Sequence, residues 1–257
     1  MYKRSFTIEE CHLSLPVKGS KTYRLVHQVS MSKQKKITNR FIREVVVRMR
    51  KMDGSDTTRE ITMVTKELLL KMGGNASVNN RLASKLATVY DRVHLTLFHD
   101  GRILSINNLE EIQNQWKRIS AEIFQDYNGR EIHMLLSKTA IKLNSEKAVI
   151  KEIKQYNFFG LLLKEMYGTF NDNTPVSKLL LLPTSPSPTE IREHIILKEK
   201  TLGHVGLQCL LDKKELDDIL YSGIFRFNIE TSWLLNAKVQ VSEKERNSIF
   251  ELIEIED

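Results

Sequence analysis

The sequence predicts an α+β protein, in which antiparallel sheets built from the N- and C-terminal parts of the chain pack against a central group of helices. Alternating apolar residues dominate both ends of the chain, whereas helical spacing dominates the middle. This order differs from the regular alternation of strands and helices that a parallel sheet requires. Turn signals such as Asp53-Gly54 and Asp100-Gly101 connect neighbouring strands, as expected of hairpins.

The N-terminal part is predicted to begin with strands. Ser5 to Leu15 and Tyr23 to Met31 each alternate apolar and polar residues, and Pro16 stops the first of them. Phe41 to Met52 is rich in β-branched residues, which favour strands. These segments provide the N-terminal sheet of the predicted fold.

The segment from Thr57 to Met72 is ambiguous. Its apolar residues Ile61, Val64 and Leu68 fit helical spacing, whereas its threonines favour a strand. We predict a helix, because the segment is long and Gly73-Gly74 follows it as a stop signal.

The strongest local signals lie between Val93 and Ile123. Val93 to Phe98 alternates as a strand, an Asp-Gly turn follows, and Arg102 to Ile106 forms the return strand. Asn107 and Asn108 are predicted to cap a helix and to close a capping box with the glutamates that follow. This helix has one apolar stripe, which must lie on the sheet: Leu109, Ile112, Trp116, Ile119 and Ile123.

More helices are predicted in the middle of the chain. Arg130 to Leu143 restarts after a glycine, and Asn144 or Ser145 can cap a further segment. Phe158 to Met166 is the most apolar run of the chain and is predicted to be central to the core.

A domain boundary is predicted near Pro175, where a polar stretch ends. It divides the chain into an N-terminal α+β domain, residues 1–170, and a smaller C-terminal β-rich unit, residues 176–257, packed on the first. The two β-rich ends resemble each other in composition, which leaves open whether they arose by duplication.

The composition bounds the class of protein. Hydrophobic residues make up 41% and charged residues 28% of the 257, as in globular proteins. No apolar run approaches the roughly 20 residues of a membrane helix, and Glu9 and Glu10 stand where a signal peptide has its apolar centre. We therefore expect a cytoplasmic protein without a transmembrane segment; a removed precursor segment stays open. Cys11 and Cys209 are far apart and are predicted to be reduced thiols.

No catalytic or metal-binding motif is found. The seven histidines are scattered without metal-ligand spacing, and no nucleophile elbow or phosphate-binding glycine loop occurs. We expect no catalytic residue, no metal and no cofactor, and favour a protein that is not an enzyme. An enzyme whose site joins remote segments, with His94, His133 or His204 meeting a carboxylate, stays open.

The net charge of +7 is concentrated in one segment, from Lys33 to Lys51. A basic hairpin there favours a non-catalytic adaptor, or an accessory subunit of a larger assembly, that binds an acidic protein surface. A tryptophan between two strands, Trp233, is added as a candidate at the rim of this surface. The predicted partner-binding residues are Lys33, Lys35, Lys36, Arg40, Arg43, Arg48, Arg50 and Trp233.

Two other binding functions stay open beside the adaptor. A pocket between the sheet and the helices, next to Phe158 to Met166, would make the protein a binding module for a small apolar ligand. Nucleic-acid binding would use the basic segment, but that segment has only one aromatic residue, Phe41, on which a base could stack.

Overall fold

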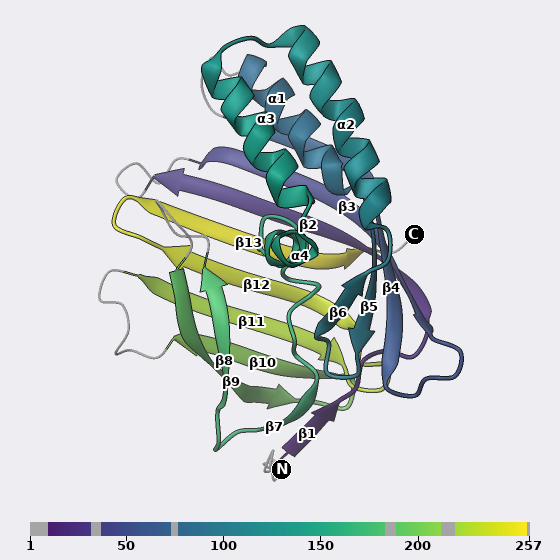
Figure 1. Ribbon diagram of the computed structural model, residues 1–257. Helices are drawn as coiled ribbons and strands as arrows, with labels where there is room; N and C mark the ends of the chain where they lie inside the picture. The colour runs from purple at the N-terminus through teal and green to yellow at the C-terminus, as the bar shows by residue number, and fades with distance from the viewer. Residues whose placement is uncertain (1–9, 32–36, 73–76, 183–188, 212–218, 256–257) are drawn as a thin grey trace.

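The computed structural model describes residues 10–31, 37–72, 77–182, 189–211 and 219–255. Thirteen strands and four α-helices lie in these ranges (Figure 1). The strands of the first part are β1 (Glu10–Leu13), β2 (Gly19–Met31), β3 (Ile37–Lys51), β4 (Thr58–Met72), β5 (Arg92–Phe98) and β6 (Ile103–Ile106). The others are β7 (Gly168–Asn171), β8 (Val176–Leu182), β9 (Thr189–Lys200), β10 (His204–Leu211), β11 (Leu220–Asn228), β12 (Leu234–Ser242) and β13 (Arg246–Ile255).

Eleven of these strands form one antiparallel sheet. Their order across the sheet is β6-β5-β4-β3-β2-β13-β12-β11-β10-β9-β8, and β1 pairs with β7 in a separate two-stranded sheet. The two ends of the chain meet at the centre of the large sheet, where β13 pairs with β2 from Arg246 opposite Met31 to Ile255 opposite Thr22. The division into residues 1–170 and 176–257 stays a prediction; the strands of both segments belong to this sheet.

The predicted fold class is wrong in the balance between helices and strands. We expected sheets covered by a central group of helices, whereas a single eleven-stranded sheet dominates and the helices are few and short. The strands are long, with 13 residues in β2 and 15 in both β3 and β4, and β-branched residues, which favour strands, recur along them.

The predicted helix over Thr57 to Met72 is also wrong, since this segment is β4. Its pairing with β3 shifts register between Glu44 and Val45, where Glu44 faces Glu67 but Val45 faces Thr65. The inward-facing positions therefore change from odd to even numbers along β4, as the bulge adds one residue. Val64 lies opposite Val46 on the other face of the sheet, so the spacings from Ile61 to Val64 to Leu68 combine residues of both faces and imitate a helix.

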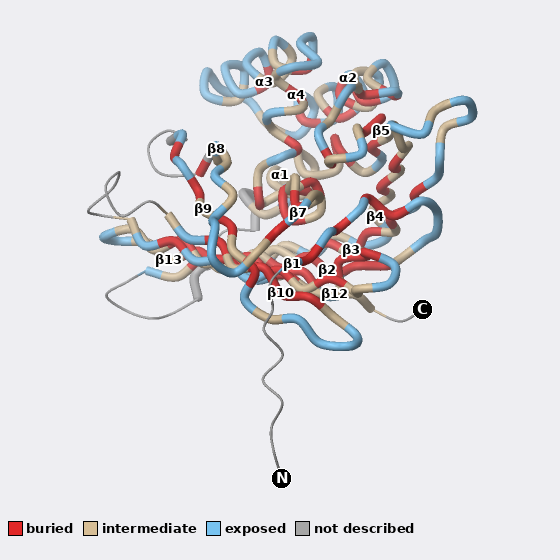
Figure 2. Tube along the Cα trace, turned by 90° about the horizontal axis from the view of Figure 1, so that it is seen from below, coloured by how far each residue is buried: buried red, intermediate tan, exposed pale blue. Residues whose placement is uncertain are grey.

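The large sheet is curved, and the helices lie on its concave side (Figure 2). Register shifts interrupt five of its strand pairings, and such bulges bend strands and increase their twist. The helices are α1 (Ser77–Ala87), α2 (Leu109–Asp126), α3 (Arg130–Leu143) and α4 (Glu146–Ile153), with a short 3-10 turn at Thr88–Tyr90.

The predicted hairpin and the helix after it are confirmed. β5 and β6 are joined at Gly101, which has a φ of 86°, and the predicted stripe of α2 buries Ile112, Trp116, Ile119 and Ile123. The predicted capping box is wrong, because no backbone N–H of α2 bonds to the Asn108 side chain, which bonds to β5 and to the Glu111 side chain. Asn108 Oδ1 accepts from His94 N at 2.9 Å, and its Nδ2 donates to Arg92 O at 3.1 Å.

Residues 154–167, called here the inner segment, run from α4 along the concave face to β7 (Figure 1). The apolar run predicted to be central to the core lies here, and Phe159, Leu161, Leu163 and Met166 are buried. The turn at Gly160 is tight, since a Cβ there would stand 2.3 Å from the Lys154 carbonyl oxygen. The inner segment therefore fills the part of the curved sheet that the helices leave uncovered.

None of the helices in the described ranges is long and apolar enough to cross a membrane.

Candidate functional site

A pocket of about 410 Å³ lies between the concave face of the sheet and the helices. Its floor is built from neighbouring strands, because pairing places alternate residues of each on the same face. Leu70 of β4 pairs with Phe41 of β3, Phe41 pairs with His27 of β2, and Val29 of β2 pairs with Asn39 of β3. Arg246 extends the floor onto β13.

The walls of the pocket come from helices and from the start of the inner segment. Ala83 and Leu86 of α1 contribute apolar surface, as do Leu135 of α3 and Phe158. Tyr90, in the 3-10 turn, packs edge-on against Phe158, with 5.3 Å between the ring centroids. The lining is therefore mostly apolar, with a small number of polar groups.

One group of polar side chains in the wall is fully paired. Tyr90 Oη donates to Glu152 Oε2 at 2.7 Å, and Lys142 Nζ donates to Glu152 Oε1 at 2.7 Å. Burial, followed by the nearby Glu152 carboxylate, raises the pKa of the Tyr90 hydroxyl, so this group stays protonated. Lys142 and Glu152 neutralise each other.

A second group of polar atoms in the pocket has no partner. His27 Nε2, Asn157 Oδ1 and Arg246 Nε are buried and lack a hydrogen bond. Burial, followed by the Arg246 charge, lowers the pKa of His27 to about 4, so the imidazole is neutral at pH 7. Buried polar atoms normally find a partner, so these three are the polar atoms of the pocket that a bound molecule could pair.

The His27 environment predicts a loss of stability in acid. The folded-state pKa of His27 lies below the ordinary value of 6.5, so its contribution is present above pH 6.5 and is lost as the pH falls toward 4. Each pKa unit corresponds to about 1.4 kcal/mol, so the expected loss is at most about 3 kcal/mol. Urea unfolding at pH 7 and pH 4 measures it.

Two variants test whether His27 causes this loss of stability in acid. H27Q should reduce the loss, and H133Q, at an exposed histidine, should not. Equal losses in the unaltered protein, H27Q and H133Q would contradict this account.

Arg43 is buried beneath the pocket. Its guanidinium donates to Ala87 O at 2.6 Å and to Tyr90 O at 3.4 Å, where α1 ends and the 3-10 turn follows. It also lies 5.0 Å from the Phe159 ring centroid and 5.5 Å from that of Phe41. Burial lowers the pKa of Arg43 to about 10, so the side chain remains charged at pH 7. Arg43 thus fastens the α1 wall of the pocket to β3.

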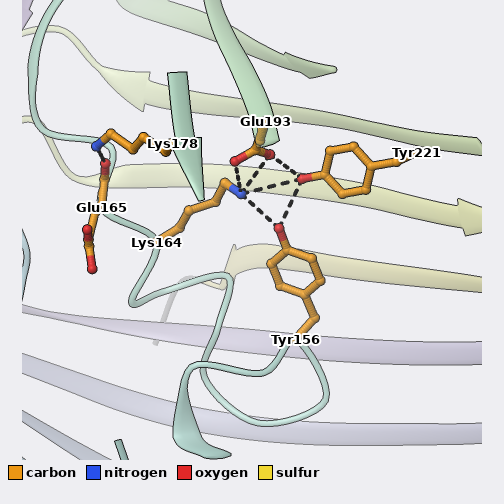
Figure 3. Close-up of polar contacts among 6 residues, drawn as sticks. All are labelled: Tyr156, Lys164, Glu165, Lys178, Glu193 and Tyr221. Atoms are coloured by element: carbon orange, nitrogen blue, oxygen red, sulfur yellow. Dashed lines mark hydrogen bonds and ion pairs between the residues drawn. The ribbon is translucent and has the colours of Figure 1, made fainter. Parts of the chain in front are cut away.

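A separate buried cluster joins the inner segment to the far half of the sheet (Figure 3). Lys164 Nζ lies 2.8 and 2.7 Å from the two Glu193 carboxylate oxygens and 2.8 Å from Tyr156 Oη. Tyr221 donates to Glu193, and its hydroxyl lies 3.0 Å from that of Tyr156. Burial alone would lower the pKa of Lys164, but the Glu193 carboxylate outweighs it and the pKa is raised.

The Lys164 cluster is closed to solvent and outside the pocket. The side chains of Lys164 and Glu193 are only 8% and 2% exposed, and the ammonium group meets both carboxylate oxygens and a hydroxyl. Since an ammonium group has three protons to donate, this arrangement satisfies it without a ligand. The cluster is therefore a structural attachment of the inner segment to β9 and β11.

The predicted partner-binding residues differ in their exposure to solvent. Arg40, Arg48 and Arg50 are exposed, and Arg50 forms an ion pair with Glu60. Arg43 and Trp233 are buried, and the Trp233 ring lies against Gly19. Lys33, Lys35 and Lys36 lie outside the described residues. Binding of an acidic partner by the exposed arginines stays a prediction.

The histidines considered for a remote-segment site contact different groups. His94 Nε2 lies 3.7 Å from Glu60, His133 packs on Phe124, and His204 Nε2 lies 3.3 Å from Glu199. Among the described residues, no cluster of histidine, cysteine and carboxylate side chains could hold a metal ion. Cys11 and Cys209 are both buried free thiols.

The site residues that sequence reasoning missed are His27, Asn157 and Arg246. These three residues are far apart in the sequence, so only the fold brings them to one pocket. The fold and site thus define a curved antiparallel sheet that carries a mostly apolar pocket under helices.

No family model matches the sequence, and no curated protein matches it. A solved structure titled "Lipid-protein interactions in lipovitellin" is 9% identical with a TM-score of 0.46, over 94% of this chain and 25% of that chain. A putative outer membrane lipoprotein-sorting protein domain from Vibrio parahaemolyticus is 7% identical with a TM-score of 0.18, over 92% and 84% of the two chains. This chain thus spans about a quarter of the lipovitellin chain. With TM-scores below 0.5, neither likeness defines the fold or the ligand of this protein.

Proposed function

We propose that the protein is a non-catalytic binding module that takes up a small, mainly apolar ligand in the pocket between the sheet and the helices. The observation that carries this proposal is the pocket itself. Its volume of about 410 Å³ lies within the range of roughly 300–1,000 Å³ that ligand pockets occupy. Apolar side chains from three strands, two helices and the inner segment converge on it.

The chemistry of the wall supports the binding of an apolar ligand. Leu70, Leu86, Leu135 and Phe158 offer surface that gains free energy when an apolar molecule replaces water. Tyr90, Lys142 and Glu152 are bonded to one another, so the charges of Lys142 and Glu152 are balanced within the wall. The pocket therefore provides burial and a few orienting polar groups.

Filling the pocket should weaken binding of a neutral apolar dye, N-phenyl-1-naphthylamine, whose fluorescence rises in an apolar site. A83F places a large ring where Ala83 of α1 lines the pocket. We expect the dissociation constant of the dye to rise at least tenfold. A121F is the matched control, since Ala121 is an exposed alanine of α2 outside the pocket. Circular dichroism and the melting temperature establish that both variants are folded.

Two results would contradict the proposal. One is the absence of saturable dye binding to the unaltered protein after extraction with organic solvent. The other is dye binding that A83F and A121F leave equally strong, because the dye would then bind elsewhere. Native mass spectrometry of the protein as purified provides an independent readout, in which a retained small molecule is expected.

A further inference from the structure

We infer that the ligand is a single-chain amphiphile whose carboxylate head lies against β2 and β13 and whose apolar chain extends toward α1 and β4. This inference rests on the ligand-binding function proposed above and names the class of ligand. Its basis is the uneven distribution of polar groups and charge around the pocket.

Two of the three unpaired polar groups, on β2 and β13, lie across the pocket from the apolar side chains of β4 and α1. Leu70 of β4 and Leu86 of α1 line one side, whereas His27 of β2 and Arg246 of β13 line the other. The sheet order β4-β3-β2-β13 separates β4 from β13 by three strand spacings, roughly 14 Å at about 4.8 Å each. A ligand that lies across these strands therefore meets an apolar surface at one end and unpaired polar atoms at the other.

The unpaired atoms can donate to an oxygen-rich head. Arg246 Nε carries a proton, and the neutral His27 ring can hold its proton on Nε2. The Asn157 amide presents a donor or an acceptor, because its two ends are interchangeable in shape. A wholly apolar ligand would leave all three without hydrogen bonds, which is costly in a buried site.

The charge balance selects a head with one negative charge. Lys142 pairs with Glu152 at 2.7 Å, and His27 is neutral at pH 7. Arg246 is then the uncompensated charge among the described side chains that line the pocket. A carboxylate has one charge and two oxygens, which match a guanidinium. A phosphate monoester, at about −1.5 to −2 near pH 7, would bring an excess of negative charge.

Competition against N-phenyl-1-naphthylamine tests this assignment with dodecanoate, dodecanol and dodecyl phosphate, each below its aggregation concentration. We expect dodecanoate to bind at least about tenfold more tightly than dodecanol, because a charge-assisted hydrogen bond is added. R246M should abolish this difference, because the guanidinium that distinguishes a carboxylate from a hydroxyl is removed. R48M removes the same charge from an exposed position outside the pocket and should keep the difference.

The outcomes separate the inference from the proposed function. Equal binding of dodecanoate and dodecanol, or a difference that R246M preserves, overturns the carboxylate head while apolar binding stands. Tighter binding of dodecyl phosphate than of dodecanoate also overturns it. If neither the dye nor any of the three compounds binds, the proposed function itself fails. Should R246M not fold, N157L decides, since loss of the Asn157 amide is expected to reduce the preference for dodecanoate over dodecanol.

Discussion

Replacing Lys164 by methionine is expected to lower the free energy of unfolding by about 3–5 kcal/mol, the usual cost of leaving one partner of a buried ion pair alone. Glu193 is 2% exposed at its side chain and would lose the ammonium group that bonds to both of its oxygens, while it keeps the Tyr221 hydroxyl as a donor. The inner segment would also lose its attachment to β9. Urea unfolding followed by circular dichroism measures the effect.

Two further variants make this expectation specific. K154M breaks the exposed ion pair between Lys154 and Glu165 in the same segment, and we expect it to cost less than about 1 kcal/mol. The double variant K164M/E193M removes both buried charges and should be more stable than K164M alone. A K164M protein as stable as K154M would show that the buried pair does not hold the inner segment.

Replacing Arg43 by leucine is expected to cost roughly 2–4 kcal/mol, since two buried carbonyl groups lose a charged donor. One of these carbonyls belongs to Ala87, the last residue of α1, and the other to Tyr90 in the 3-10 turn. Both residues line the pocket. We therefore expect R43L to weaken dye binding as well as stability. Equilibrium unfolding and dye titration of the same preparation measure the two effects.

R48L is the matched control for R43L, because Arg48 lies on the same strand and is exposed. We expect it to change stability by less than about 0.5 kcal/mol. R43K keeps the charge but loses the forked donor geometry of a guanidinium, so an intermediate stability is expected. If R43L and R48L are equally stable, then the contacts of Arg43 contribute nothing measurable to the fold.

Local patterns predicted the elements in which neighbouring residues determine the structure. The hairpin of β5 and β6 follows from alternation and from a glycine at positive φ, and α2 follows from its apolar stripe. Ser145 caps α4 as predicted, accepting from Ala148 N at 3.3 Å. These features depend on contacts within a few residues, which a sequence displays directly.

Alternation along β3 could also have separated Arg43 from the other arginines. Arg40, Arg48 and Arg50 stand at even positions, whereas Arg43 shares odd positions with Phe41 and Val45 on the buried face. Successive residues of a strand point to opposite faces, so Arg43 was predicted to belong to the wrong surface. Its buried partners come from α1 and the following turn, which that pattern does not show.

The sequence by itself determined the antiparallel hairpins, the apolar faces of the strands and helices, and the apolar character of the inner segment, because each depends on spacing along the chain. Only the tertiary structure decided that β2 and β13 meet in one curved sheet, that Lys164 is buried against Glu193, and that His27, Asn157 and Arg246 line one pocket. The physical reason is that strand order and bulges bring residues from distant segments together, and no local spacing records which distant strands pair.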